Sequence, residues 1–263
     1  MFHYFFRTVS FSFIFLILFS ACQNEPERKY IEWGSENKFA DELIKKARFH
    51  HQNAEWHAAH SYFKAALDFD STNFATYVML AWYTPSGNLK NKYVENAKKY
   101  VMGKNETSKL FVSTLDIDGG EGALSRWHEV WSEMHKIEPE GRFIHSNYAS
   151  TKPTTQEQID EYEILLEKLK SNDTTNGRSY AHILNSLGYY YYSLDQKETS
   201  KKYFDEYIKA YPGSNSYDSM GEFYYYEKDY ENSLKSYKKS LEYYSQSLSG
   251  NEKVKELESL LKK

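Results

Sequence analysis

The sequence has few of the residues that mark disulfide-bonded, disordered or nucleic-acid-binding proteins. Its 263 residues include a single cysteine, which excludes a disulfide within the chain. Five prolines and 12 glycines are too few for a disordered or low-complexity protein. Charges of both signs are mixed along the chain and sum to −4, so there is no basic stripe and no nucleic-acid partner is expected.

Catalytic motifs are also missing. The chain has no G-x-S-x-G elbow and no K-T-G triplet, and two S-x-x-K matches, at 61–64 and 236–239, fall inside expected helices of a chain rich in Ser and Lys. H-E-x-x-H is absent, because Ser132 stands where the second histidine would follow His128 and Glu129. A non-catalytic protein without a cofactor is therefore expected.

Histidines gather between His50 and His60. His57 and His60 share a helix face at a spacing of three residues, which together with Glu55 would suit a metal ion. Their expected positions face outward or line a turn, so we interpret them as surface histidines and predict no metal site from the sequence.

Two segments near the C-terminus, 185–212 and 217–244, repeat each other with a period of 33 residues. Small and aromatic residues recur in the same order in both: Gly188 and Gly221, Ser200 and Ser233, Phe204 and Tyr237. The glycines and serines let two amphipathic helices approach closely, and the aromatic residue fills the space toward the next pair. Pro212 then ends the first repeat, because proline cannot continue a helix interior.

This pattern resembles the tetratricopeptide repeat family, whose period is about 34 residues. The resemblance implies an all-α solenoid of helical hairpins, in which each repeat needs a neighbour to bury its apolar face. Residues 248–263 carry Val254, Leu257, Leu260 and Leu261 at helical spacing and are predicted to form a C-terminal capping helix.

The repeats extend upstream with decreasing clarity. Matching small and aromatic positions recur in 40–73, 74–101, 108–139 and 142–172. The match is weakest in 103–177, where Trp127 and Trp131 replace small residues. About six helix pairs are therefore expected over 38–247.

The N-terminus has the three-part layout of a secretory signal. An apolar run from Phe11 to Phe19 follows Arg7 and ends at Ser20-Ala21-Cys22, and it is too short to span a bilayer stably. The site resembles the lipobox of bacterial lipoproteins, with Phe19 where Leu is usual. The resemblance implies that residues 1–21 are removed and that Cys22 is diacylated. Residues 22–37, polar at first and containing Pro26, are expected to form a tether.

This resemblance also implies a location. Gln23 after the cysteine resembles outer-membrane sorting in Gram-negative bacteria, and the acidic run after it resembles the export signals of Bacteroidota lipoproteins. Two acyl chains hold a protein stably at a membrane. The protein is expected in the cell envelope, anchored in the outer membrane through lipid and facing the periplasm or the cell exterior.

The 25 tyrosines are the anomaly of the composition. In the tetratricopeptide family the first helices of the repeats line a concave groove. The resemblance places eight residues there: His182, Asn185, Tyr189, Tyr192, Asp218, Glu222, Tyr225 and Tyr226. Such an aromatic, mildly acidic wall suits an extended peptide or a saccharide. It lacks the lysines with which family members clamp a terminal carboxylate. The other interpretation of the Tyr runs is that part of each run is core.

Three functions follow from these observations. The first is a non-catalytic protein–protein interaction module, an adaptor or scaffold of the envelope that binds an extended peptide in the Tyr-rich groove. The second is a glycan-binding lipoprotein that uses exposed tyrosines as stacking platforms. The third is an enzyme with a site in 103–177, for which a convergence of His128, Glu129, His135 and His145 would be the evidence.

Overall fold

The computed structural model describes residues 29–262, and this part of the chain forms thirteen α-helices, one 3-10 turn and no strand. The first four pairs of helices are α1 (Lys38–Gln52) with α2 (Trp56–Phe69), α3 (Phe74–Tyr83) with α4 (Asn88–Tyr100), α5 (Glu106–Ser113) with α6 (Ala123–Ile137), and α7 (Arg142–Ser150) with α8 (Thr155–Ser171). Two further pairs are α9 (Ala181–Ser193) with α10 (Lys197–Ala210) and α11 (Ser214–Tyr226) with α12 (Tyr230–Tyr243). The last helix, α13 (Leu248–Leu260), packs on α12.

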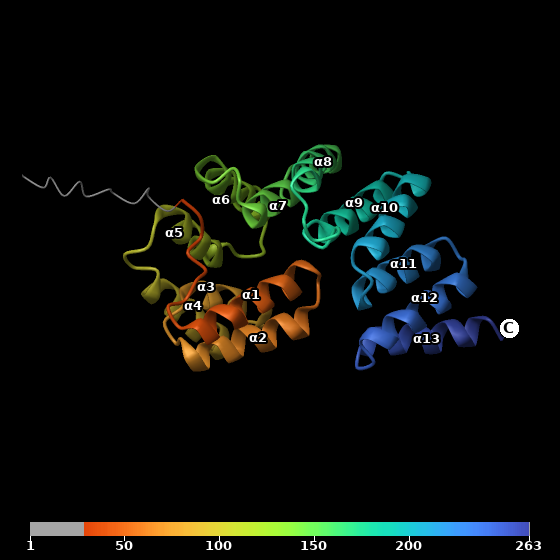
Figure 1. Ribbon diagram of the computed structural model, residues 1–263, viewed down its shortest axis with the longest axis horizontal. Helices are drawn as coiled ribbons and strands as arrows, with labels where there is room; N and C mark the ends of the chain where they lie inside the picture. Colours follow the sequence, from red (N-terminus) through yellow and green to blue (C-terminus); the bar gives the residue numbers. More distant parts are fainter. Residues whose placement is uncertain (1–28, 263) are drawn as a thin grey trace, which may run out of the picture.

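The pairs follow one another along an arch (Figure 1). The chain runs from α1 and α2 over α5 to α8 and down through α9 to α13. Leu257 of α13 is fully buried, and the rest of that helix is largely exposed. This arrangement confirms the predicted all-α solenoid of helical hairpins with a C-terminal capping helix. None of the helices between residues 29 and 262 combines the length and the apolar character that crossing a bilayer requires.

The glycine and serine positions of the repeat explain how the last two pairs close. The Ser200 hydroxyl donates to the Gly188 carbonyl at 2.8 Å, and the Ser233 hydroxyl donates to the Gly221 carbonyl at the same distance. A Cβ at Gly188 would lie 2.6 Å from the Phe204 ring. The two helices of the pair therefore meet at a distance that only glycine permits, as the repeat predicts.

Helix starts in the first half depend on side-chain caps. Asn37, Asn73 and Asn105 accept hydrogen bonds from the first turns of α1, α3 and α5. Thr154 and Glu157 form a reciprocal capping box at the start of α8. These caps satisfy backbone N–H groups that have no partner within a helix.

Region 103–177 is divergent because its first helices are short. Helices α5 and α7 have eight and nine residues, against 13 in both α9 and α11. Aromatic side chains fill the space between these helices. The Phe143 ring of α7 meets Phe111 and Trp131 edge to face at 5.8 Å. Bulky rings replace the small residues of the repeat here, which hides the periodicity in the sequence.

Residues 29–34, part of the polar tether predicted over 22–37, pack and bond against the helices instead. Ile31 and Trp33 are 2% and 8% exposed and belong to the core of the N-terminal half. The Trp33 ring packs against Phe111 at 5.1 Å and Phe143 at 5.2 Å. Alternating apolar residues thus place a short non-helical segment against the helix pairs. The predicted signal and Cys22 lie outside the described residues.

Side-chain amides hold the backbone of this segment. The Asn105 Nδ2 group donates to the Tyr30 carbonyl at 2.7 Å, and the Asn73 Nδ2 group donates to the Trp33 carbonyl at 3.0 Å. The Ser108 hydroxyl accepts from the Glu32 amide at 3.0 Å. The N-terminal ends of α3 and α5 therefore bind a non-helical stretch of the same chain.

The turn between α1 and α2 contacts helices far along the sequence. Arg142 of α7 donates to Gln52 at 3.0 Å, and the Tyr211 hydroxyl, just after α10, donates to Glu55 at 2.9 Å. Phe49 meets the Tyr211 ring edge to face at 5.7 Å. These contacts join the first hairpin to the second half of the arch and cover part of its inner side.

Candidate binding site on helices α9 and α11

Helices α9 and α11 bring together residues one repeat apart. Tyr189 on α9 donates a hydrogen bond of 2.6 Å to Oε2 of Glu222 on α11, which lies 33 residues later. Tyr226, one turn beyond Glu222, donates to its other oxygen at 2.8 Å. Both carboxylate oxygens of Glu222 are thus bonded to tyrosine hydroxyls.

Tyr192 extends this contact along α9. Its hydroxyl donates to Glu227 at 3.0 Å, and its ring lies 5.8 Å from the rings of Phe223 and Tyr226. Glu227 is further paired with Lys197 at 3.0 Å. We refer to Tyr189, Tyr192, Asp218, Glu222 and Tyr226 as the tyrosine–carboxylate wall.

Asp218 is the residue of the wall without a partner. It is half-buried, one turn before Glu222, and makes no hydrogen bond or ion pair within residues 29–262. Burial, followed by repulsion from Glu222, raises the pKa of Asp218 to about 6. Glu222 has no lysine or arginine partner among the described residues either. The wall therefore holds two neighbouring carboxylates without a compensating cation.

Burial and hydrogen bonds to carboxylates raise the pKa of the tyrosines of the wall. Burial and the bond to Glu222 raise the pKa of Tyr189, and the bond to Glu222 followed by burial raises the pKa of Tyr226. The ring of Tyr226 is 53% exposed. The wall accordingly offers aromatic ring surface and negative charge, and its hydroxyl donors are already bonded.

Tyr225 lies at the edge of the wall and turns toward the capping helix. Its hydroxyl donates to Glu256, and the Lys253 ammonium lies 3.9 Å from the centre of its ring. Lys253 and Glu256 are not among the predicted groove residues. The helical spacing in 248–263 predicts only the capping helix that carries them. With Lys253 and Glu256 paired at 2.9 Å, α13 closes this end of the wall.

His182 and Asn185 lie at the other end of the wall. The Nε2 atom of His182 and the Oδ1 atom of Asn185 are buried and have no partner in the described part of the chain. Burial, followed by the positive charge of Arg142 and by His51, lowers the pKa of His182 to about 3. The eight predicted groove residues thus do not form one continuous open surface. The sequence of α9 alone gives no sign of this burial, because Arg142 of α7 and His51 of α1 approach His182 only in the fold.

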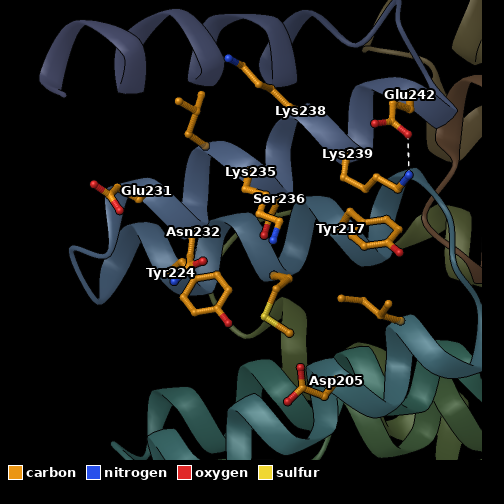
Figure 2. Close-up of a pocket in the computed structure, with 13 residues that line it drawn as sticks. Asp205, Tyr217, Tyr224, Glu231, Asn232, Lys235, Ser236, Lys238, Lys239 and Glu242 are labelled. Carbon is orange, nitrogen blue, oxygen red and sulfur yellow. Dashed lines mark hydrogen bonds and ion pairs between the residues drawn. The ribbon is translucent and has the colours of Figure 1, made fainter. Parts of the chain in front are cut away.

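A hollow lies on another face of α11, away from the tyrosine–carboxylate wall (Figure 2). It has a volume of about 740 Å³ between α10, α11 and α12, with Ile208, Met220 and Leu234 among its lining residues. Charges of both signs surround it, including Lys239, which is paired with Glu242. Because charges of both signs line the hollow, it shows no preference for an anion or a cation.

The structure also places the histidines that the sequence singled out. Glu55 is bonded to His50 at 2.5 Å and to Tyr211, so it does not join His57 and His60 in a cluster. In region 103–177, His128 and His135 both stack on Tyr148, and the His145 ring lies 4.5 Å from His135 at an angle of 43°. Glu129 is exposed and takes no part in this stack.

Comparisons with known proteins agree with the architecture. No family model and no curated protein matches the chain. Among solved structures, the "APC/C hetero-tetramer Cut9-Hcn1" aligns with a TM-score of 0.51 at 12% identity, over 83% of this chain and 42% of that one. The chain therefore spans less than half the length of that protein.

Two bacterial tetratricopeptide repeat proteins give lower scores. The protein from Thermus thermophilus aligns at 14% identity with a TM-score of 0.43, and the protein from Parabacteroides merdae at 12% identity with a TM-score of 0.40. Each alignment covers 83% of this chain and 98% of the other. With its 33-residue repeat and its succession of helix pairs, the chain has the tetratricopeptide-type fold, a solenoid of helical hairpins.

Proposed function

We propose that the protein is a non-catalytic interaction module that binds an extended segment of a partner protein along the tyrosine–carboxylate wall. The observation that carries this proposal is the pair Asp218 and Glu222. Asp218 is half-buried without a partner, and a carboxylate in that position is stabilised by an approaching cation. The partner segment is therefore expected to present a lysine or arginine.

The tyrosines supply the rest of the contact. Tyr192 and Tyr226 stand beside Glu222 with their rings 5.8 Å apart. A ring face next to a carboxylate suits a long basic side chain, whose methylene groups pack on the ring while its charge reaches the acid. Tyrosine also gives a large contact area with little loss of rotamer freedom.

The N-terminal half supports a peptide as the occupant. There the helix ends already hold the non-helical segment 29–34 through bonds from Asn73 and Asn105 to its carbonyl groups. A saccharide would need exposed rings lying parallel to one another along the wall. Instead, Tyr226 is tilted by 33° against Tyr192 and by 73° against Tyr225. Peptide binding is thus favoured over saccharide binding.

The first experiment measures binding to a peptide array at low and moderate salt. Wild-type protein is expected to bind peptides that contain Lys or Arg, with affinity that falls as salt rises. Glu222→Gln should weaken this binding at least about tenfold, since truncating a desolvated charge pair costs about 2–5 kcal/mol. Glu231→Gln, at an exposed position on α12, is the matched control and should bind as wild type.

Two results would contradict the proposal. Equal binding by wild type and Glu222→Gln would remove the wall as the peptide site. Binding to a saccharide array that Tyr192→Ala abolishes, without any peptide binding, would establish the glycan-binding alternative in its place.

The anchor is the second part of the proposal. The layout of residues 7–22 supports a lipid-modified Cys22, and hence a module held at the outer membrane of the cell envelope with its wall facing the periplasm or the exterior. Cys22→Ala in the full chain should move the protein from the membrane fraction to the soluble fraction. Membrane association that persists in this variant would exclude the lipid anchor.

A further inference from the structure

Three consecutive helices bring two histidines and a glutamate together in region 103–177. His135 lies in the last turn of α6, His145 on α7 and Glu161 on α8. One donor atom from each side chain lies within 4.8 Å of the other two. The two imidazole rings are 4.5 Å apart, and the Nε2 atom of His145 lies 2.7 Å from Oε1 of Glu161.

We propose that His135, His145 and Glu161 form a binding site for a transition-metal ion, with Zn²⁺ as its expected occupant. Imidazole nitrogen and carboxylate oxygen are ligands that Zn²⁺ prefers, at about 2.0–2.2 Å. Donor atoms at that distance in a tetrahedron lie about 3.3 Å apart. Donors now within 4.8 Å reach this arrangement by side-chain adjustment, with the backbone in place.

The burial of the two histidines supports a ligand role. His145 is 4% exposed, and its Nδ1 atom has no partner among residues 29–262. The Nδ1 atom of His135 is buried without a partner as well. Buried polar atoms are nearly always bonded in folded proteins, so the unpartnered Nδ1 atom of His135 indicates that a further group belongs in the cluster, where His145 faces Glu161 through its Nε2 atom.

The ligand set also suits a cation by its chemistry. Two imidazole nitrogens and one carboxylate converge, and Glu161 supplies the negative charge of the site.

Neighbouring residues hold the three ligands in place. The Tyr148 ring stacks on His135 at 4.6 Å with an angle of 14° between the rings. Lys152 donates to the Tyr148 hydroxyl at 2.6 Å and lies 3.6 Å from Oε2 of Glu161. Replacement of a residue that orients a metal ligand, as the Tyr148 ring does for His135, commonly changes metal affinity about 10–100-fold. Lys152 also competes with the ion for the Glu161 charge.

Three protein ligands leave a coordination position for water or for a donor atom of another molecule. Catalytic zinc sites have this layout, whereas structural sites use four protein ligands. The proposed site is independent of the tyrosine–carboxylate wall, since it depends on α6, α7 and α8, whereas the wall lies on α9 and α11.

The test is isothermal titration of the metal-free full chain with Zn²⁺, repeated with Co²⁺ to follow its visible absorption. We expect one ion per chain and a Co²⁺ spectrum of four- or five-coordinate type. His135→Ala and Glu161→Gln should each weaken Zn²⁺ binding at least about 100-fold, because they remove direct ligands. Glu161→Gln keeps the side-chain size, so a folded variant is available even where His135→Ala is unstable.

Two further variants separate coordination from general effects on the fold. His128 stacks on Tyr148 at 5.5 Å and bonds to Thr151 and Ser132, outside the cluster, so His128→Ala should bind Zn²⁺ as wild type. Lys152→Met should bind Zn²⁺ more tightly, because it removes the competing positive charge. Absence of Zn²⁺ binding, or binding that Glu161→Gln leaves unchanged, would overturn the proposal.

Discussion

The Tyr189 hydroxyl donates to Oε2 of Glu222 at 2.6 Å, and the two residues occupy equivalent positions of successive repeats, 33 residues apart. One repeat thus places a donor where the next places an acceptor. The backbone position is the same in both repeats, but it carries Tyr189 in one and Glu222 in the next, so the two side chains form a hydrogen bond across the interface between repeats. The same interface leaves Asp218 without a partner, and this imbalance leads to the first prediction.

Asp218→Asn should stabilise the free protein at pH 7 and weaken its binding to basic peptides. The folded-state pKa of about 6 lies above the ordinary value of 3.8, so the folded state binds the proton more tightly than the unfolded state does. The contribution of Asp218 to stability is therefore greatest below pH 4 and is lost as the pH rises through 6.

The expected gain for Asp218→Asn at pH 7 is about 1–2 kcal/mol, after allowance for solvent screening. Urea unfolding at pH 4, 5, 6 and 7 measures it, and the gain should shrink toward pH 4. Glu231→Gln serves as control. A gain that does not depend on pH would mean that burial and Glu222 do not destabilise the charged form of Asp218.

Gly188→Ala should destabilise the fold although alanine is the better helix former. Alanine in a helix interior gains about 1 kcal/mol over glycine. Its Cβ, however, would lie 2.6 Å from Phe204, a ring that is 1% exposed and cannot move aside. Overpacking of this kind costs about 1–3 kcal/mol, so the net loss should be up to about 2 kcal/mol.

Urea denaturation provides the comparison. Gly119→Ala is the control, because a Cβ at Gly119 meets nothing within 4 Å. At Gly221 the nearest ring atom of Tyr237 is 2.9 Å away, so Gly221→Ala should cost less than Gly188→Ala. Wild-type stability for Gly188→Ala would show that the helix pair is looser than its contacts indicate.

The architecture could be predicted from the sequence because a repeat states the same local information several times. Gly188, Ser200 and Phe204 correspond to Gly221, Ser233 and Tyr237, 33 residues later. Each position contributes to the close approach of two helices. Local rules of this kind are enough to predict a hairpin and, by succession, a solenoid. In region 103–177, large rings such as Trp131 replace the small residues, and the spacing becomes harder to recognise.

The candidate site could be predicted only in part, because its limits depend on contacts between distant segments. The sequence placed Tyr189 and Glu222 on one wall, since a one-repeat separation aligns them. It gave no sign that the Nε2 atom of His182 would be buried near Arg142 of α7 and His51 of α1. Nor did it show that Ile31 and Trp33 would leave the expected tether and enter the core.

Trp33→Ala should destabilise the protein by about 3–5 kcal/mol, the usual cost of removing a buried large aromatic side chain. Trp33 packs on Phe111 and Phe143, and the Arg48 guanidinium lies 4.4 Å from its ring centre. Tyr30, three residues earlier and 52% exposed, is the matched control, and Tyr30→Ala should change stability by less than about 1 kcal/mol. Chemical denaturation measures both variants, and a small loss for Trp33→Ala would restore the tether interpretation of residues 29–37.

Acidification from pH 6.5 to 4 should lower the free energy of unfolding through two partly buried histidines, His51 of α1 and His182 of α9. Burial lowers the pKa of His51 to about 4 and that of His182 to about 3, so both side chains are neutral in the folded state. Their contribution to stability is fully present above the ordinary pKa of 6.5 and is lost as the pH falls toward 4, because the unfolded chain binds protons that the folded chain excludes.

His182→Gln removes one of these groups while keeping a polar side chain of similar length. The decline in stability between pH 6.5 and 4 should be shallower in this variant than in wild type, by about 1 kcal/mol or more at pH 4. His57→Gln, at an exposed position of α2, should follow the wild-type curve. Thermal unfolding at half-unit pH steps provides the curves. The protonation of Asp218 stabilises the fold over the same pH range, so the comparison is best made in Asp218→Asn protein. In that protein, coincident curves for His182→Gln and His57→Gln would mean that protonation of His182 does not destabilise the fold.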